Sequence, residues 1–267
     1  MTRPIGVFDS GVGGLSVVRA VRHQLPDADV LFFADQAHVP YGPRSMEEVR
    51  RFSEGITRFL LDQDAAPIVV ACNTASAAAL RHLRQTFPGI DFVGMEPAVK
   101  PAAQTTTSKV VGVLATPATF QGELYASVVE RFGRGVRLIN QVVPGLVEQI
   151  EAGRLDSPDT ERILAAALQP ILTAGADTIV LACTHYPFVI PLIARLAGPS
   201  ITVIDPAPAI ARQTARLRPS AGGERRGSLT LITSGDPAAL QAMSQRLIGE
   251  GGVARAATWA GDRLILT

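Results

Sequence analysis

Residues 68–74 read Ile-Val-Val-Ala-Cys-Asn-Thr, and residues 178–184 read Thr-Ile-Val-Leu-Ala-Cys-Thr. In each stretch a short aliphatic run ends at a cysteine, which is followed by residues that can begin a helix. Short apolar runs of this kind are typical of strands in a parallel sheet. Ligand sites in such sheets lie beyond the carboxyl ends of the strands. The two stretches therefore predict an α/β fold, and they place both cysteines where a site would form.

Apolar runs alternate with longer amphipathic stretches along most of the chain, a pattern typical of parallel strands joined by helices. The predicted strands are Ile5–Phe8, Val30–Ala34, Ile68–Ala71, Phe92–Gly94, Val110–Leu114, Val136–Ile139, Thr178–Leu181, Ile201–Ile204 and Leu229–Thr233. The predicted helices are Leu15–Gln24, Ser45–Asp62, Ala75–Thr86, Gln121–Arg131, Asp159–Thr173 and Pro237–Gly249. Residues 219–227 predict a surface loop.

The chain also resembles itself. Residues 5–11, Ile-Gly-Val-Phe-Asp-Ser-Gly, are similar to residues 111–117, Val-Gly-Val-Leu-Ala-Thr-Pro, at an offset of 106 (Gly6 to Gly112). The two stretches that contain the cysteines are related by an offset of 111 residues (Cys72 to Cys183). Two strand ends that repeat at nearly one spacing indicate two related α/β units. The alternative is that apolar strands followed by small polar residues resemble one another by chance.

Composition sets the class of protein. The 267 residues are 47% hydrophobic and 18% charged, which is enough apolar material for one large domain or two. A net charge of +1 gives no reason to expect nucleic acid. No apolar run approaches the roughly 20 residues that span a bilayer, and the first residues do not form a signal peptide. We therefore expect a cytoplasmic protein that binds neither nucleic acid nor a membrane.

Both cysteines are candidates for reactive groups. A thiol at a helix N-terminus feels backbone N–H groups and the positive end of the helix dipole, which favour the thiolate. A lone free cysteine is more often a small buried hydrophobic residue. Two cysteines at matching positions of two similar units favour the reactive interpretation, and they do not form a disulfide framework.

Polar residues near the cysteines could take part in acid–base chemistry. His185 lies two residues after Cys183, and Asp9 ends the first strand, where it could approach Cys72. These four side chains could also be drawn as zinc ligands, but no closely spaced pair supports a metal site. The other histidines, His23, His38 and His82, are expected at the surface.

The glycine-rich stretch at residues 9–14, Asp-Ser-Gly-Val-Gly-Gly, allows a second interpretation as a dinucleotide loop, with Asp35 as the ribose-binding acid. The third glycine of that fingerprint is replaced by Ser16, and Asp9 would place negative charge near a pyrophosphate. The loop can equally present N–H groups and the Ser10 hydroxyl to a carboxylate.

Together the motifs resemble those of glutamate racemases, in the aspartate/glutamate racemase superfamily. The matching stretches are residues 9–15 (Asp-Ser-Gly-Val-Gly-Gly-Leu), 40–42 (Pro-Tyr-Gly), 71–76 (Ala-Cys-Asn-Thr-Ala-Ser) and 182–187 (Ala-Cys-Thr-His-Tyr-Pro). They occur in the family's order over most of the chain. The resemblance implies two pseudosymmetric parallel-sheet α/β domains that face an interdomain active-site cleft. The implied domains are residues 1–97 with 208–267, and residues 98–207.

The resemblance also implies roles for individual residues. Cys72 and Cys183 resemble the two catalytic thiols, with Asp9 and His185 as assisting groups. Glu151 resembles a further acidic residue of the family, with Glu148 as the nearby alternative. Val143 stands where relatives often have a cysteine. Implied substrate contacts, besides Asp9, Cys72, Cys183 and His185, are Ser10, Pro40, Tyr41, Gly42, Asn73, Thr74, Thr116, Thr119 and Thr184.

Inversion of a stereocentre requires a proton to leave one face and another to arrive at the opposite face. A thiolate and a thiol on opposite sides of an α-carbon satisfy that requirement. Neither lysine, Lys100 nor Lys109, lies in a recognisable pyridoxal phosphate motif, and the resemblance implies a route without a cofactor. No metal is expected, because no closely spaced ligand pair is present. The resemblance further implies glutamate as substrate, a homodimer, and supply of D-glutamate for peptidoglycan.

Three alternatives remain open from the sequence. The chain could be a related two-cysteine racemase or isomerase acting on aspartate, a hydantoin or another diacid. It could be a dinucleotide-dependent oxidoreductase. It could also be a non-catalytic regulatory binding protein that has kept the fold.

Overall fold

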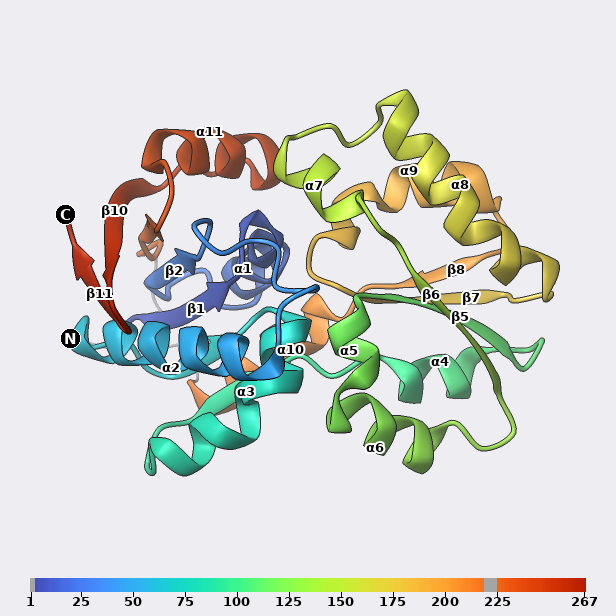
Figure 1. The fold of residues 1–267 in the computed structure, drawn as a ribbon, viewed down its shortest axis with the longest axis horizontal. Coiled ribbons are helices and arrows are strands. Elements are labelled where there is room, and N and C mark those ends of the chain that lie inside the picture. The colour runs from blue at the N-terminus through green and yellow to red at the C-terminus, as the bar shows by residue number, and fades with distance from the viewer. Residues whose placement is uncertain (1–2, 219–224) are drawn as a thin grey trace.

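The computed structural model describes residues 3–218 and 225–267, and it consists of two lobes, each built on its own sheet (Figure 1). The first lobe is defined here by a seven-stranded sheet in the order β11-β10-β9-β2-β1-β3-β4, and the second by a four-stranded sheet in the order β6-β5-β7-β8. The strands are β1 Ile5–Asp9, β2 Val30–Ala34, β3 Ile68–Val70, β4 Phe92–Gly94, β5 Val110–Ala115, β6 Arg137–Val142, β7 Thr178–Ala182, β8 Thr202–Ile204, β9 Leu229–Thr233, β10 Val253–Ala260 and β11 Arg263–Leu266. All pairings are parallel except that of β10 with β11. The predicted α/β class with parallel sheets is confirmed.

The two lobes repeat the same strand order. In the first, β2-β1-β3-β4 corresponds strand by strand to β6-β5-β7-β8 in the second. The register repeats as well, because Gly6 pairs with Ile68 on β3, and its counterpart Gly112 pairs with Ile179 on β7. The pseudosymmetry expected from the sequence repeat is therefore present in the backbone. The domain boundaries near residues 97 and 207 stay predictions.

Helices connect the strands and cover both faces of each sheet (Figure 1). Their bounds are η1 Val12–Gly14, α1 Leu15–Gln24, α2 Met46–Asp62, α3 Asn73–Thr86, α4 Val99–Thr105, α5 Pro117–Gln121, α6 Glu123–Phe132, α7 Leu146–Glu151, α8 Pro158–Thr173, η2 Tyr186–Val189, α9 Ile190–Ala197, α10 Ala207–Leu217 and α11 Pro237–Ile248. The start of α2 is fixed by a capping box, in which Ser45 and Glu48 satisfy each other's backbone N–H groups. Asp236 caps α11 ahead of Pro237.

The C-terminal strands were not predicted. β10 and β11 extend the first sheet beyond β9, which returns the end of the chain to the lobe in which it began. Residues 253–260 read Val-Ala-Arg-Ala-Ala-Thr-Trp-Ala, and only Ala257 among them is fully buried. An edge segment of this kind lacks the continuous apolar run that marks the central strands. Of the predicted loop at 219–227, residues 219–224 lie outside the described residues.

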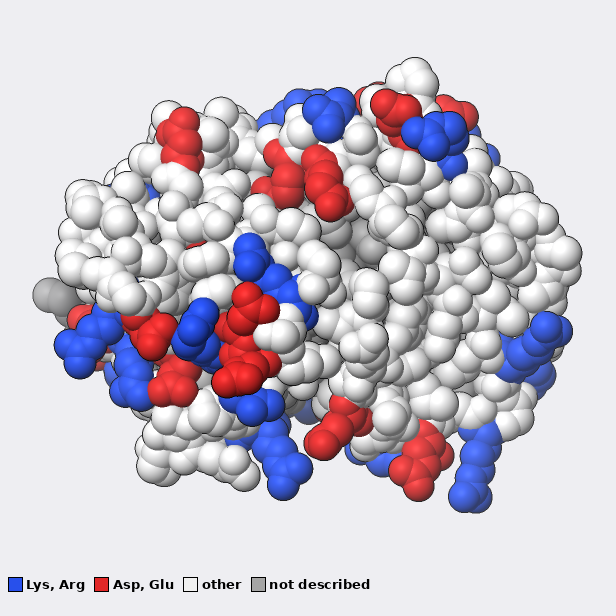
Figure 2. Space-filling model, in the orientation of Figure 1, with Lys and Arg blue, Asp and Glu red and all other residues white. Residues whose placement is uncertain are grey.

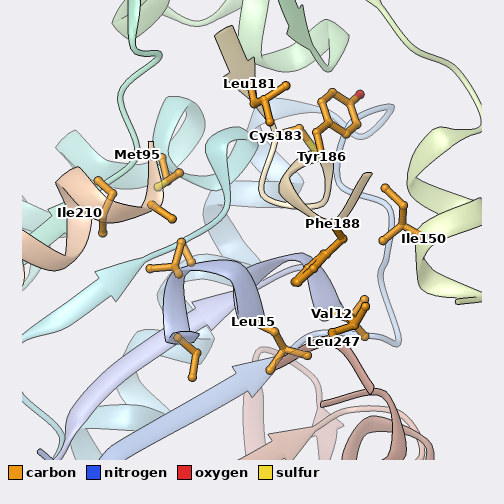
Figure 3. Packing of buried hydrophobic residues seen from close by; sticks show 14 of the residues in the cluster. Val12, Leu15, Met95, Ile150, Leu181, Cys183, Tyr186, Phe188, Ile210 and Leu247 are labelled. Atoms are coloured by element: carbon orange, nitrogen blue, oxygen red, sulfur yellow. The ribbon is translucent and has the colours of Figure 1, made fainter. Parts of the chain in front are cut away.

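One apolar core is shared by both lobes. It includes Val12 and Leu15 from the first lobe and Leu181, Cys183 and Phe188 from the second. Figure 3 shows Phe188 directed toward α1, with Val12 beside Leu247 of α11. A second cluster packs under α2 and α3 of the first lobe, and a third packs in the second lobe. The shared core holds the carboxyl ends of the central strands of both sheets close together.

Charge is distributed unevenly over the visible face. Figure 2 shows acidic and basic side chains gathered over α2, whereas the centre of the second lobe, over β6 and α5, carries few. Within residues 3–218 and 225–267, none of the helices combines the length and apolar character needed to cross a bilayer.

Candidate active site

The two thiols line one cavity between the lobes. Cys72 follows β3 of the first sheet and Cys183 follows β7 of the second, which are corresponding strands. Both side chains are buried and outside any disulfide, and both lie in the lining of a cavity of about 210 Å³. The duplicated strand ends therefore bring one thiol from each lobe to a common space.

Cys72 is the N-cap residue of α3. Its sulfur accepts a hydrogen bond from the backbone N–H of Ala75 at 3.4 Å and lies 4.0 Å from the Ser10 hydroxyl. Burial, and next the negative charge of Asp9, raise the pKa of the Cys72 thiol above its usual value despite the helix N–H group. For this cysteine the prediction of a lowered pKa is wrong, because loss of solvation outweighs the helix terminus. Cys72 is a thiol at neutral pH.

Asp9 lies behind this end of the cavity and is fully buried. Its Oδ1 accepts hydrogen bonds from the Gly11 N–H at 3.0 Å and the Ser10 hydroxyl at 3.4 Å. Its Oδ2 accepts from the Thr184 hydroxyl of the second lobe at 2.9 Å. Burial raises the pKa of Asp9 above its usual value, although His185 and Gly11 oppose the shift. Asp9 thus links the two lobes, and it reaches Cys72 through Ser10 rather than by direct contact.

Cys183 has a different set of neighbours. Its sulfur lies 3.8 Å from Nδ1 of His185, and Nε2 of that ring lies 2.6 Å from Oε1 of Glu151. Burial lowers the pKa of His185, but the contacts with Cys183 and Glu151 outweigh it, so the pKa stands well above its usual value. Burial raises the pKa of Glu151, but the hydrogen bond with His185 brings it below its usual value. The pair is therefore an imidazolium and a carboxylate, with the imidazolium beside the sulfur.

The glycine-rich loop of the first lobe accommodates this pair. The backbone N–H of Val12 donates to Glu151 Oε1 at 2.7 Å. A methyl group added at Gly11 would overlap Glu151, and one added at Gly13 would overlap His185. The loop needs glycine because side chains from the second lobe occupy the space above its backbone. That space is where a dinucleotide pyrophosphate would have to bind.

Most of the predicted substrate contacts surround the cavity. Those in its lining are Ser10, Pro40, Tyr41, Gly42, Cys72, Asn73, Thr74, Thr116, Cys183, Thr184 and His185. Asp9, Thr119 and Glu151 are not in the lining and lie behind residues that are. The Tyr41 hydroxyl donates to Asp35 at 2.6 Å, so its proton is directed away from a ligand.

Besides His185 and Glu148, the lining of the cavity offers neutral hydrogen-bonding groups. Both polar atoms of the Asn73 side chain are buried without a hydrogen-bond partner in the described structure, an arrangement that is rare unless a ligand completes it. The Thr116 hydroxyl lies 2.9 Å from the hydroxyls of both Thr74 and Thr119, which forms a short chain across the two lobes. These amide and hydroxyl groups can bind carboxylates or an ammonium group.

The sequence did not predict the wall formed by the end of β6, the turn after it and the first turn of α7. Its members in the lining are Val142, Val143, Pro144, Gly145, Val147 and Glu148. Val143 was noted only as a departure from relatives, yet it contacts the cavity. Glu148 is exposed at the rim, whereas Glu151 supports His185 from behind, which separates the two acids by position.

Tyr186 also lines the cavity. Burial, Cys183 and Glu148 hold the pKa of its hydroxyl well above the usual range, so it keeps its proton. Neither Lys nor Arg occurs among the lining residues, all of which are described. Within the described residues, no three side chains of His, Cys, Asp or Glu are grouped so that they could hold a metal ion.

Comparison with known proteins gives one consistent family. Residues 14–214 match the family model described as Asp/Glu/Hydantoin racemase. A glutamate racemase from Roseiflexus sp. (strain RS-1) is 50% identical over 250 residues, which is 92% of each chain. A glutamate racemase from Francisella tularensis, solved in complex with D-glutamate, superposes with a TM-score of 0.82 at 26% identity over 97% of each chain. That from Escherichia coli, solved with L-glutamate and the activator UDP-MurNAc-ala, gives a TM-score of 0.81 at 32% identity and covers 94% of this chain and 96% of its own. The chain therefore belongs to the Asp/Glu/hydantoin racemase family of isomerases.

Proposed function

We propose that this chain interconverts L-glutamate and D-glutamate by proton transfer between the substrate α-carbon and two thiols. The observation that carries the proposal is the pair of buried cysteines, one from each of two corresponding strand ends, in the lining of one cavity. Glutamate enters the proposal through the relatives, of which two were solved with its L and D forms.

The reaction needs one thiolate and one thiol. The thiolate removes the α-proton and becomes a thiol, and the electron pair of the broken C–H bond moves onto the α-carboxylate. The opposite thiol then delivers its proton to the other face of the carbon and becomes a thiolate. The product is the mirror image of the substrate, and the two cysteines have exchanged protonation states.

The structure supports a resting state with unequal thiols. Cys72 keeps its proton because burial and Asp9 raise its pKa. Cys183 lies beside the His185 imidazolium, whose charge stabilises a thiolate. In this state Cys183 is the base and Cys72 the acid, and the reverse assignment serves the other enantiomer.

After the α-proton has left, neutral hydrogen-bond donors and backbone dipoles stabilise the deprotonated substrate. Removing the α-proton places charge on the carboxylate, and donors that are already in position stabilise such charge without reorganisation. The unpartnered Asn73 amide and the N-terminus of α3 provide such donors. Lys100 and Lys109 are not in the cavity lining, so neither can form a Schiff base there, which supports a route without pyridoxal phosphate.

We infer the cellular role from the same family relationship. D-glutamate made by this chain would supply peptidoglycan synthesis in the cytoplasm, and the active species would be a homodimer. Rescue of a D-glutamate auxotroph tests the role, and sedimentation of the purified protein tests the dimer.

The direct test is incubation of reduced protein with L-glutamate in D₂O without added cofactor. We expect loss of optical activity together with entry of deuterium at the α-carbon, whereas in Cys72→Ser and in Cys183→Ser the optical activity should persist. Turnover of aspartate or a hydantoin in place of glutamate would keep the mechanism and correct the substrate. No exchange with any diacid would favour a non-catalytic binding protein, and an absorbance change with a nicotinamide cofactor would favour an oxidoreductase.

A further inference from the structure

Asp35 is a buried carboxylate that the proposed mechanism does not use. It follows β2 directly, is fully buried, and is not in the cavity lining. From the sequence it was the candidate acid for a nucleotide ribose. In the structure its oxygens are fully engaged by the protein.

Four side-chain donors converge on this carboxylate. Oδ2 accepts from the Tyr41 hydroxyl at 2.6 Å and lies 2.9 Å from Nδ1 of His38. Oδ1 accepts from the Ser234 hydroxyl at 2.7 Å and from the indole N–H of Trp259 at 2.8 Å. Burial raises the pKa of Asp35, but these hydrogen bonds outweigh it and lower the pKa below its usual value. Asp35 is therefore ionised, and no lone pair remains for a ribose.

The donors come from two distant parts of the chain. His38 and Tyr41 belong to the segment between β2 and α2, whereas Ser234 belongs to the turn after β9 and Trp259 to β10. The expectation that His38 lies at the surface is wrong in part, because its ring stacks on Phe52 at a centroid separation of 3.9 Å. The Ser234 hydroxyl also accepts from the Ala37 N–H at 2.9 Å, which adds a second link.

The far end of the β2–α2 segment forms a wall of the active-site cavity. Pro40, Tyr41 and Gly42 are in the lining. Figure 1 shows this segment extending from β2 toward the second lobe before it turns back to α2. A methyl group at Gly42 would lie 3.2 Å from Cβ of Thr116, so the wall closely approaches the second lobe.

We propose that Asp35 is a positioning residue for the substrate site, which holds the Pro40–Gly42 wall in its binding geometry by anchoring Tyr41 to the C-terminal strands. Substrate recognition by the first lobe then depends on β9 and β10, which contribute no residue to the cavity. This inference rests on the proposed racemisation, because its main readout is turnover of glutamate.

Different substitutions of Asp35 have different expected effects. In Asp35→Ala, all four donors lose their acceptor and the wall loses its anchor. The KM for glutamate should rise about 10- to 100-fold, because small misplacements of binding groups have effects of this size. The kcat should change much less, because neither thiol contacts Asp35, and such a split identifies lost binding.

Asp35→Asn should be much milder, with less than about a fivefold change in KM. An asparagine offers one acceptor and one donor group. Its oxygen can serve Trp259, which can only donate, and the Ser234 hydroxyl. Its NH₂ can donate to the Tyr41 hydroxyl and to the other tautomer of His38, because both groups can accept.

Asp29 provides a matched control at the opposite end of β2. Its carboxylate accepts from Arg225 side-chain N–H groups and from the N–H and hydroxyl of Ser228, away from the cavity. Asp29→Ala removes a comparable number of hydrogen bonds, and it should leave KM and kcat at their wild-type values. A rise in KM in Asp29→Ala equal to that in Asp35→Ala would overturn the proposal.

Trp259 gives a readout that does not require activity, because it is the only tryptophan in the chain. Loss of its bond to Asp35 should shift its emission to longer wavelength in Asp35→Ala and not in Asp29→Ala. Tyr41→Phe removes one donor and leaves the carboxylate in place, so it tests the link if Asp35→Ala does not fold. Its KM should rise while the Trp259 emission stays as in the wild type.

The outcomes separate the two proposals. Inactive wild-type protein, with the emission shift still present in Asp35→Ala, would count against racemisation and not against the anchor. Active wild type with an unchanged KM in both Asp35→Ala and Tyr41→Phe would overturn the positioning role.

Discussion

The Cys72 end and the Cys183 end of the cavity have the same backbone origin and different electrostatics. Each thiol follows the third strand of its four-strand unit, in equivalent register. At one end a buried carboxylate, Asp9, lies behind the thiol, and at the other an imidazolium lies beside it. Duplication supplied the mirror-like placement of two acids. The two thiols therefore have equivalent backbone positions and unlike charged neighbours.

The largest expected effect comes from removing one thiol at a time, which tests the two ends of the cavity separately. Cys72→Ser and Cys183→Ser should each lower racemisation by about 10²–10⁴-fold or more, because a positioned acid or base is lost. Each variant keeps one thiol, which can remove and return a proton on one face only. In D₂O we therefore expect slow α-deuterium exchange without inversion, on opposite enantiomers for the two variants.

This exchange experiment is needed because overall kinetics cannot reveal the asymmetry. Two enantiomers in water have equal free energy, so kcat/KM must be equal in both directions for every variant. Exchange measured by NMR on each enantiomer is free of that constraint. Exchange of the same enantiomer by both variants would contradict the placement of the thiols on opposite faces.

The next effect tests whether His185 serves only its own end. His185→Gln removes the imidazolium beside Cys183, and racemisation should fall about 100-fold. Combined with Cys72→Ser, the substitution should abolish the exchange that depends on Cys183. In the Cys183→Ser background, His185→Gln should leave the α-deuterium exchange by Cys72 close to the rate measured for Cys183→Ser alone. Equal losses in both backgrounds would mean that His185 acts on the whole site.

Asp9→Asn is the counterpart at the Cys72 end. We expect about a tenfold loss of racemisation. The loss should appear in the exchange by Cys72 when Cys183 is serine, and only weakly in the exchange by Cys183 when Cys72 is serine. The Asp9–Thr184 hydrogen bond crosses between the lobes, so a thermal unfolding curve of each variant must accompany the kinetics.

An effect of similar size tests the Cys183 end from the opposite lobe. Gly13→Ala places a methyl group against His185, so the ring must move from its place beside Cys183. We expect a loss in kcat of about tenfold, with the exchange by Cys72 preserved. Gly251→Ala is the matched control, because its methyl would meet no atom closer than 3.4 Å. A wild-type rate in Gly13→Ala would show that the loop does not hold the ring in place.

The sequence predicted the parts of this molecule that depend on local pattern. All nine predicted strands are present, and the central ones, such as β1, β3, β5 and β7, are short apolar runs. The strand-end position of both thiols follows from the same pattern. The segment between β6 and α7 was missed as a cavity wall, since nothing in Val-Val-Pro-Gly distinguishes a wall from a surface turn.

Long-range pairings could not be predicted. Glu151 meets Val12 across 139 residues, and Trp259 meets Asp35 across 224. No periodic pattern of apolar residues predicts a contact between residues so far apart in the sequence. The sequence also could not predict that the pKa of Cys72 is raised, because this shift depends on how completely the folded protein excludes water. The helix terminus was visible in the sequence, but the burial that outweighs it was not.

The smallest expected effect concerns stability, and it belongs to the Cys183 end alone. The folded pKa of His185 is raised, so its contribution to stability is complete below about pH 6.5 and is lost as pH rises through the raised value. The folded pKa of Glu151 is lowered, so its contribution is present above about pH 4.5 and is lost as pH falls through the lowered value.

Between these limits the pair stabilises the fold, and His185→Gln should lower the free energy of unfolding by about 1–2 kcal/mol near pH 6. Because the wild type loses this contribution at alkaline pH, the two proteins should converge as pH rises from 7 toward 10. Urea unfolding of both proteins across that range measures the difference. A constant difference at every pH would mean that His185 stabilises the fold by packing, and that the charge beside Cys183 is weaker than its contacts indicate.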